Sequence, residues 1–247
     1  MAIEIYNVSK SSLLVFGCST KVVQPELLQI GKITLPIKHS VVYAGVYVSN
    51  SKSSVERTQL ACEKLRKLIN VNHDCGLYFG GFNPISAVYI WRRVLLPCAI
   101  YGCNVWGKLS QREYDMLEAT QRFFMKKVQG LSKRTPNVIV QDTLKVTSLQ
   151  GYIDQQSLLL LGKLCNARSM FVFKQMFLFR FGQFKCKMAT VHKKKFDTKS
   201  PVYNMLRLVF KYDLCDEINN YINTSQFQKK HIWSQIVKDK INAYETV

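Results

Sequence analysis

The side chains in this sequence with the clearest chemical capacity are lysines and arginines, and the chemistry open to them is phosphate binding. The 247 residues include 35 Lys and Arg against 16 Asp and Glu, which gives a formal net charge of +19. The excess is uneven, because residues 151–200 contain ten Lys and Arg and two acidic residues, Asp154 and Asp197. A chain this basic is expected to bind an anion, with nucleic acid as the first candidate and an acidic membrane surface as the second.

Two groups of cations are the candidate phosphate contacts. The first is expected on one side of a helix over residues 111–129, whose other side is apolar, and in the turn after it: Arg122, Lys126, Lys127, Lys133 and Arg134. The second is the run Lys193, Lys194 and Lys195, in a stretch (182–199) that is predicted to be a loop or hinge. Contacts of this kind neutralise phosphates whatever the base sequence. A solvated helix face is the alternative interpretation of the first group.

Aromatic side chains offer a second way to bind nucleic acid, by stacking on bases. Phenylalanines between Phe171 and Phe184 interleave with Lys174, Arg180 and Lys185. Single-stranded bases could stack there, but the mixed spacing of these rings favours core packing.

Residues for catalysis are harder to find. Phosphoryl transfer with two metal ions needs closely placed carboxylates. The only adjacent acidic pair in the sequence, Asp216-Glu217, falls at the start of an expected helix, where the helix dipole explains it. The GxSxG, HExxH, GxxxxGK[ST] and GxGxxG patterns are absent. We therefore predict no catalytic residue, and no enzyme activity from this chain as it stands.

The eight cysteines favour neither disulfides nor zinc. The sequence contains no Cys-x-x-Cys pair and does not begin with a secretory signal. Its most apolar stretch, Ile85–Trp106, is interrupted by Arg92 and Arg93, so no membrane span is expected. We predict buried, reduced thiols, no bound metal, and a nuclear or cytoplasmic protein that is not secreted.

The elements that must position the cations change in character along the chain. Strands are expected before Asn50, with Ile33–Ile37 and Val41–Val48 forming a hairpin around Lys38-His39-Ser40. Helices are expected after it over residues 54–70, 84–101 (kinked or ended near Pro97), 111–129, 152–167, 169–181, 201–212, 214–223 and 226–243. Capping boxes mark several starts: Ser53-x-x-Glu56, Ser110-x-x-Glu113 and Ser225-x-x-Gln228.

The start of the chain resembles the region just after the catalytic hairpin in reverse transcriptases of non-LTR (LINE-type) retrotransposons. Asn7-x-x-Lys10-Ser11, followed by Leu14–Gly17, is similar to that family's Asn-x-x-Lys-[Thr/Ser] motif and the strand after it. Val42–Val46 resembles the family's Tyr-Leu-Gly-Val strand, which is associated with gripping the primer, although Ala44 replaces the usual Leu.

The following segments resemble, in order, the helical thumb of the same family. They are Gly76-Leu77, Asn83-Pro84, Trp91, Leu96-Pro97, Tyr101-Gly102 and Trp106, then Leu117-Glu118-x-x-Gln121 and Gly130-Leu131-Ser132. Part of this set is similar to the signature Leu-Pro-x-Leu-x-Tyr-Gly-x-Glu-x-Trp, with Asn104 where the family often has Glu. The resemblance is strongest from residue 5 to 165.

The resemblance implies roles in primer and triphosphate binding that could not be inferred from the residue types alone. Tyr43 and Gly45 would lie at the primer grip, with ordinary strand packing as the alternative. Lys10 would influence the incoming triphosphate, with a surface lysine as the alternative. The family's paired catalytic aspartates, which hold Mg²⁺, would precede Met1, so the Mg²⁺ ligands are missing and no cofactor is expected.

We therefore expect an α+β, mostly α chain with three parts. These are a palm-remnant β segment with a small antiparallel sheet (1–50), a helical thumb-like domain (51–168) and a basic helical C-terminal extension (169–247). The expected function is that of a catalytically incomplete fragment of an RNA-directed DNA polymerase, which grips template–primer nucleic acid (RNA, DNA or RNA–DNA duplex) through its thumb. Two alternatives stay open: a free-standing, sequence-nonspecific nucleic-acid-binding or interaction protein derived from a retroelement, and a basic peripheral membrane protein. If the chain comes from a retrotransposon that has lost its function, it would have no partner in the cell.

Overall fold

A computed structural model of the chain describes residues 11–14, 29–30, 33–49, 55–168, 172–190 and 200–245. The structure is mostly helical (67%), with small antiparallel pairings of strands before the helices, as the sequence predicts. The chain divides into two compact units, Met1–Arg57 and Thr58–Val247. The three-part domain division stays a prediction.

Two strand pairs form the described part of the first unit. β1 (Gln29–Ile30) pairs with β2 (Ile33–Thr34), and β3 (Ser40–Tyr43) pairs with β4 (Val46–Ser49), both antiparallel. The turn of the second hairpin is Ala44-Gly45, because Tyr43 lies opposite Val46.

This turn corrects the predicted hairpin, whose turn was expected at Lys38-His39-Ser40. The predicted strand Val41–Val48 instead contains the turn. Ala44 and Gly45 both have positive φ, 48° and 78°, which is what a two-residue turn needs to match the twist of its strands. Gly45 has no Cβ to oppose that conformation. The hydroxyl of Ser49 donates to the carbonyl of His39 at 3.1 Å across the open end of the hairpin.

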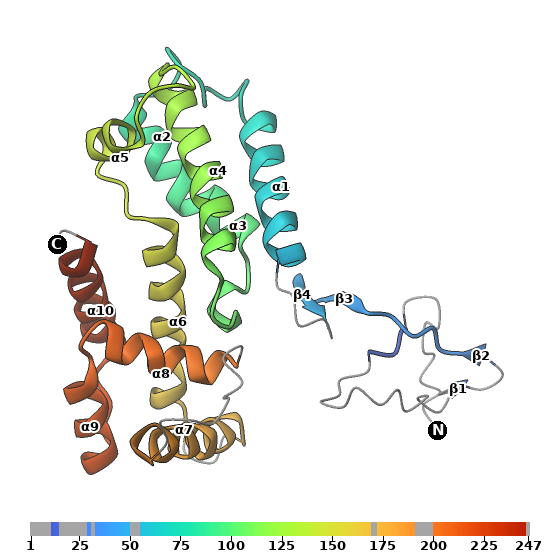
Figure 1. The fold of residues 1–247 in the computed structure, drawn as a ribbon, viewed down its shortest axis with the longest axis vertical. Coiled ribbons are helices and arrows are strands. Elements are labelled where there is room, and N and C mark those ends of the chain that lie inside the picture. The colour runs from blue at the N-terminus through green and yellow to red at the C-terminus, as the bar shows by residue number, and fades with distance from the viewer. Residues whose placement is uncertain are drawn as a thin grey trace. The chain divides into compact units, whose positions relative to one another are not determined.

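Helices make up the second unit (Figure 1). They are α1 (Val55–Val71), which begins in the first unit, α2 (Pro84–Ile90), the π-helical η2 (Trp91–Leu95), α3 (Leu96–Ala99), the 3₁₀ turn η3 (Cys103–Val105), α4 (Gln111–Gln129), α5 (Asn137–Leu144), α6 (Leu149–Asn166), α7 (Val172–Thr190), α8 (Pro201–Lys211), α9 (Cys215–Thr224) and α10 (Lys230–Glu245).

Several helix boundaries differ from the prediction, most of all the start of α10 and the end of α7. α10 begins at Lys230 rather than near Gln226, because Ser225 has a φ of 56° and ends α9 instead of capping α10. The predicted capping box at Ser225 is therefore wrong. α7 continues to Thr190, so the loop predicted over 182–199 is wrong for residues 182–190, and residues 191–199 lie outside the described residues. Gly182 did not stop the helix, because an isolated glycine in a helix is tolerated at a modest cost.

The predicted irregularity near Pro97 is a π-helical turn. Proline has no N–H to donate, so the backbone before it cannot continue the regular α-helical pattern. The N–H of Leu96 bonds to the carbonyl of Trp91, five residues earlier. The result is one bent helical rod from Pro84 to Ala99, with Arg92 and Arg93 inside its π turn.

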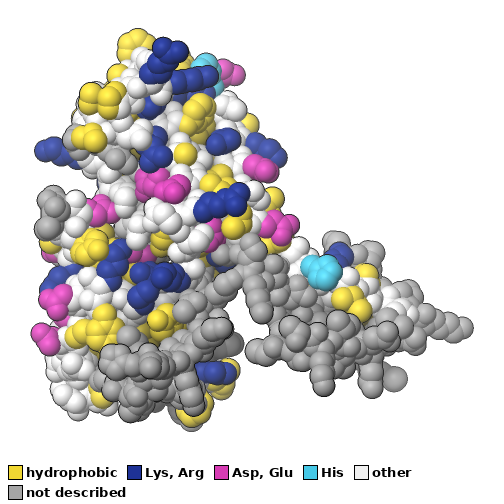
Figure 2. Space-filling view, in the orientation of Figure 1, with side chains coloured by type: hydrophobic (Ala, Val, Ile, Leu, Met, Phe, Trp, Pro, Cys, Tyr) yellow, Lys and Arg dark blue, Asp and Glu magenta, His cyan; other side chains and the backbone are white. Residues whose placement is uncertain are grey.

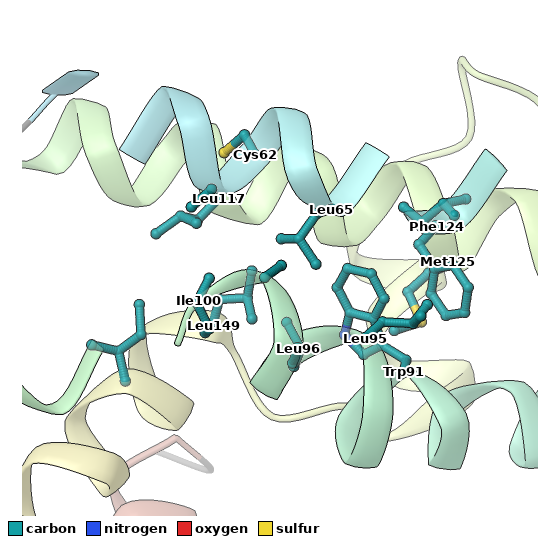
Figure 3. Close-up of a cluster of buried hydrophobic side chains, with 14 of the residues drawn as sticks. Cys62, Leu65, Trp91, Leu95, Leu96, Ile100, Leu117, Phe124, Met125 and Leu149 are labelled. Atoms are coloured by element: carbon teal, nitrogen blue, oxygen red, sulfur yellow. The ribbon is translucent and has the colours of Figure 1, made fainter. Parts of the chain in front are cut away.

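The second unit has two hydrophobic clusters. The first draws on α1, α2, η2, α3, α4 and the start of α6, and Figure 3 shows side chains from these elements pointing toward one another. At its centre the rings of Trp91 and Phe124, both fully buried, stack with their centroids 4.6 Å apart. The second cluster joins the rest of α6 to α7, α8, α9 and α10 around the buried Trp233.

α6 belongs to both clusters. Leu149 and Ile153 lie in the first, whereas Leu158, Leu161 and Cys165 lie in the second. Between them, Asp154 is completely buried and its Oδ2 accepts hydrogen bonds from Lys211 Nζ at 2.9 Å and the Tyr212 hydroxyl at 2.8 Å. This ion pair ties α6 to the end of α8.

Candidate nucleic-acid interface

α4 is the element that positions the first predicted group of cations. It begins with the predicted capping box, in which the Ser110 hydroxyl and backbone N–H both donate to Glu113 Oε2, at 2.7 and 2.8 Å. Its apolar stripe is buried in the first cluster, with Leu117, Phe124 and Val128 each at most 1% exposed. The helix ends at Gly130, whose φ of 65° is the left-handed C-cap conformation. The predicted helix bounds and the buried stripe are confirmed.

The cations stand on the other side of α4 and in the loop that follows. We call this set the α4 cation cluster: Arg122, Lys126, Lys127, Lys133 and Arg134. Arg122 and Lys126 are one helical turn apart and so share a face. Lys126 Nζ donates to the carbonyl of Lys133 at 2.8 Å, which folds the loop back onto the helix. Lys133 and Arg134 are exposed, and the three helical cations are half-buried with their stems along the surface.

No member of the cluster forms an ion pair within the described part of the chain, although the charge of Arg122 acts on the nearby Glu118 carboxyl. The ion pairs found there join Lys211 to Asp154, Lys240 to Asp213 and His73 to Asp74, and none includes a member of the cluster. Lys126 and Lys127 also occupy the last turn of α4, where cations are stabilised by the negative end of the helix dipole. These cations are therefore available to an external anion.

Glu118 and Gln121, two residues of the segment that resembles the family's thumb, form hydrogen bonds that hold α4 in place. Glu118 Oε1 accepts the backbone N–H of Leu149 at 2.6 Å. Gln121 accepts from Trp91 Nε1 at 3.3 Å and donates to the carbonyl of Thr147 at 3.2 Å. Through these bonds α4 is fixed to η2 on one side and to the start of α6 on the other.

The other predicted site residues lie in the first unit or outside the described residues. Tyr43 is 76% exposed at the end of β3, and Gly45 lies in the hairpin turn, both in the first unit. Lys10, Lys193, Lys194 and Lys195 lie outside the described residues. Phe177 and Phe181 are buried in the second cluster with their ring centroids 5.4 Å apart, so core packing is the correct interpretation for these two rings.

Sequence reasoning missed an aromatic loop beside the cluster, formed by residues 72–83 between α1 and α2. Tyr78, Phe79 and Phe82 are 39%, 69% and 42% exposed. The only signal for it was the run Tyr-Phe-Gly-Gly-Phe at residues 78–82, which reads as a turn. Figure 2 shows hydrophobic side chains beside Lys and Arg side chains at the top of the view, where Figure 1 places this loop and the end of α4.

The prediction of buried cysteines is confirmed for Cys62, Cys103 and Cys165 and is wrong for Cys75 and Cys98, which are exposed. The described residues hold no group of three or more His, Cys, Asp or Glu residues that could bind a metal ion. Burial raises the pKa of the Cys62 thiol, and that of the Cys165 thiol to about 12, so neither is a reactive thiolate at neutral pH. In the part of the chain that is described, no helix has the length and apolar character needed to span a bilayer. No protein-family model, curated protein or solved structure matches the chain.

Proposed function

We propose that this chain is the post-catalytic part of an RNA-directed DNA polymerase of the non-LTR retrotransposon type, and that its helical unit grips template–primer nucleic acid as a thumb. The observation that carries the proposal is the α4 cation cluster, which lies opposite a buried apolar stripe and outside every ion pair among the described residues. The resemblance of the sequence to the family's thumb supports the same assignment. The β segment before the helices is the palm remnant in this proposal.

The mechanism of grip is electrostatic. A duplex carries a regular row of phosphates, and each cation that contacts one releases a condensed counterion. Arg122 and Lys126, one turn apart on α4, would meet neighbouring phosphates along a strand, while Lys127, Lys133 and Arg134 extend the contact at and past the end of the helix. Such contacts position the duplex without reading its sequence. A catalytically incomplete fragment would keep this binding and have no activity of its own.

The test is the salt dependence of binding to a labelled RNA–DNA duplex, measured by fluorescence anisotropy. Log affinity should fall linearly with log salt, by about 0.9 per phosphate neutralised. The double variant Lys127→Ala/Arg134→Ala should make the slope shallower by about 1.8, which is the value for two lost phosphate contacts. The control variant Lys229→Ala/Lys230→Ala removes the same charge at the start of α10, beside the second cluster, and should keep the wild-type slope. Equal slopes for the two variants would contradict the proposal.

A free-standing nucleic-acid-binding protein derived from a retroelement is the second candidate. It is favoured by the two hydrophobic clusters, whose described members all belong to the helical unit. The two candidates differ in ligand preference. A thumb should bind an RNA–DNA duplex with a recessed 3′ end more tightly than the same length of DNA duplex, whereas a nonspecific binder should not distinguish them.

A further inference from the structure

We infer that the aromatic loop, residues 72–83, is a stacking platform for unpaired bases of a nucleic-acid strand whose phosphates the α4 cation cluster holds. The inference rests on the proposed function and adds a ligand class to it, single-stranded bases. It starts from the exposure of Tyr78, Phe79 and Phe82 within five consecutive residues. Three large rings exposed together are a feature that needs explanation, because contiguous apolar surface marks interaction sites.

The loop is a built structure rather than a loose connection. Leu77, only 1% exposed, anchors it in the first hydrophobic cluster. Backbone hydrogen bonds close successive turns, from Gly76 N to the His73 carbonyl at 2.9 Å and from Phe82 N to the Gly76 carbonyl at 2.8 Å. Rings on such a loop are held in place before a ligand arrives, so little conformational entropy is lost when one binds.

Each ring is supported on one side and open on the other. Tyr78 stacks on His73 with ring centroids 5.0 Å apart. Phe82 lies over Gly76, where an added Cβ would meet its Cδ2 at 3.0 Å. Phe79 lies over Gly130, where an added Cβ would meet its Cδ2 at 2.5 Å, yet 69% of the residue is exposed.

The contact of Phe79 with Gly130 joins the platform to the cations. Gly130 is the C-cap of α4, and its N–H bonds to the carbonyls of Lys126 and Lys127. The most exposed ring therefore lies against the last turn of the helix that carries the cluster. Alternating aromatic rings and cations is the arrangement by which proteins bind single strands, with rings on the bases and charges on the backbone. A purely apolar partner would not match the cluster's positive charge, whereas a nucleic-acid strand matches both features.

The experiment compares two single strands of 15 nucleotides, oligo-dT and an abasic strand of equal charge, by fluorescence anisotropy with the full chain. Wild-type protein should bind oligo-dT about tenfold more tightly than the abasic strand, the gain expected from one stacked base. Phe79→Leu should bring that ratio close to one while leaving the salt slope unchanged. Phe79→Tyr keeps the ring and should keep the ratio. The control Phe210→Leu removes another exposed ring, 52% exposed, from α8 and should also keep the ratio.

The inference is overturned by a wild-type ratio near one, or by a Phe79→Leu ratio equal to that of wild type. Circular dichroism of Phe79→Leu shows whether this variant is still folded. Phe79→Tyr tests the ring separately, because it keeps an aromatic side chain at the same position and should keep the affinity ratio. The duplex measurement with Lys127→Ala/Arg134→Ala reports on the proposed function separately. If Lys127→Ala/Arg134→Ala lowers the duplex salt slope but Phe79→Leu keeps the oligo-dT to abasic ratio, the proposed function is supported and the stacking platform is refuted. If Phe79→Leu lowers the ratio but the lysine and arginine variant keeps the slope, stacking is supported and the proposed electrostatic grip is refuted.

Discussion

At the scale of single residues, the most informative side chain is Glu118, a carboxyl inside the helical unit. Burial raises its pKa, and this effect outweighs the backbone N–H groups of Leu149 and Gln150 and the charge of Arg122, which lower it. The carboxylate form is therefore less stable in the folded protein than in the unfolded chain. Glu118 Oε1 accepts the Leu149 N–H at 2.6 Å, and this bond favours the charged form without offsetting the cost of burial.

Glu118→Gln should make the protein more stable at neutral pH relative to wild type. Because the folded-state pKa is raised above the unfolded value, wild-type stability falls as pH rises through the interval between the two, at about 1.4 kcal/mol per unit of pKa difference. Glutamine avoids this loss and keeps an oxygen for the Leu149 N–H. Urea unfolding at pH 4 and pH 7 measures the change, with the exposed Glu63→Gln as the control. A difference between Glu118→Gln and wild type that does not grow from pH 4 to pH 7 would be incompatible with this assignment.

The sequence could predict the type of the cations but not their surroundings. Arg122, Lys126 and Lys127 were expected on the polar side of a helix because the apolar residues at 114, 117, 124 and 128 recur at helical spacing. The hydrogen bond from Lys126 to the carbonyl of Lys133 depends on the geometry of the turn after α4. The position of Phe79 over Gly130 depends on a contact between residues about 50 apart in the sequence. Neither leaves a periodic pattern, so the aromatic loop was missed.

At the scale of elements, the packing of α10 on α6 depends on a glycine. The Trp233 indole covers Gly162, where an added Cβ would meet its Nε1 at 2.5 Å. The same indole donates from Nε1 to the carbonyl of Leu158 at 2.8 Å and is 1% exposed. The absence of a side chain at position 162 is what lets the two helices approach.

Gly162→Ala should destabilise the protein by about 1–3 kcal/mol, the usual cost of adding an atom to a tightly packed site. This loss would exceed the gain of about 0.5–1 kcal/mol that alanine brings to a helix interior. Gly182→Ala in α7 is the matched control, since nothing lies within 4 Å of its would-be Cβ, and it should be stabilising. Urea unfolding curves of the two variants should shift in opposite directions; a shift in the same direction would refute the close packing of Trp233.

Elements were predictable from sequence where local signals and packing agree. α4 has a capping box, an apolar stripe and a terminal glycine, and its bounds were predicted residue by residue. The hairpin was placed wrongly because Ala44-Gly45 is a weaker turn signal than Asn-Gly, and the β-branched residues around it read as one strand. Ser225 failed as a cap because a positive φ, which serine seldom adopts, ends α9 there.

At the scale of the whole molecule, the described residues of both hydrophobic clusters belong to the helical unit, beginning with Ala61. A shortened chain of residues 52–247 should therefore unfold cooperatively with a Tm within about 3 °C of the full chain, and bind the RNA–DNA duplex with the same salt slope. Differential scanning calorimetry gives the Tm. A shortened chain without a cooperative transition would mean that the first unit stabilises the helices.

The sharing of α6 between two clusters has a consequence for how this chain can lose residues over time. A chain that ended between residues 162 and 166 would lack all of α7 to α10 and leave Leu158 and Leu161 without their partners in the second cluster. A chain that began just before Leu149 would leave Leu149 and Ile153 without their partners in the first cluster. Neither product can bury its apolar side chains, so both are substrates for cellular proteases. A gene that shortens by chance must therefore keep the reading frame through α6 at both of its ends, or yield no folded protein.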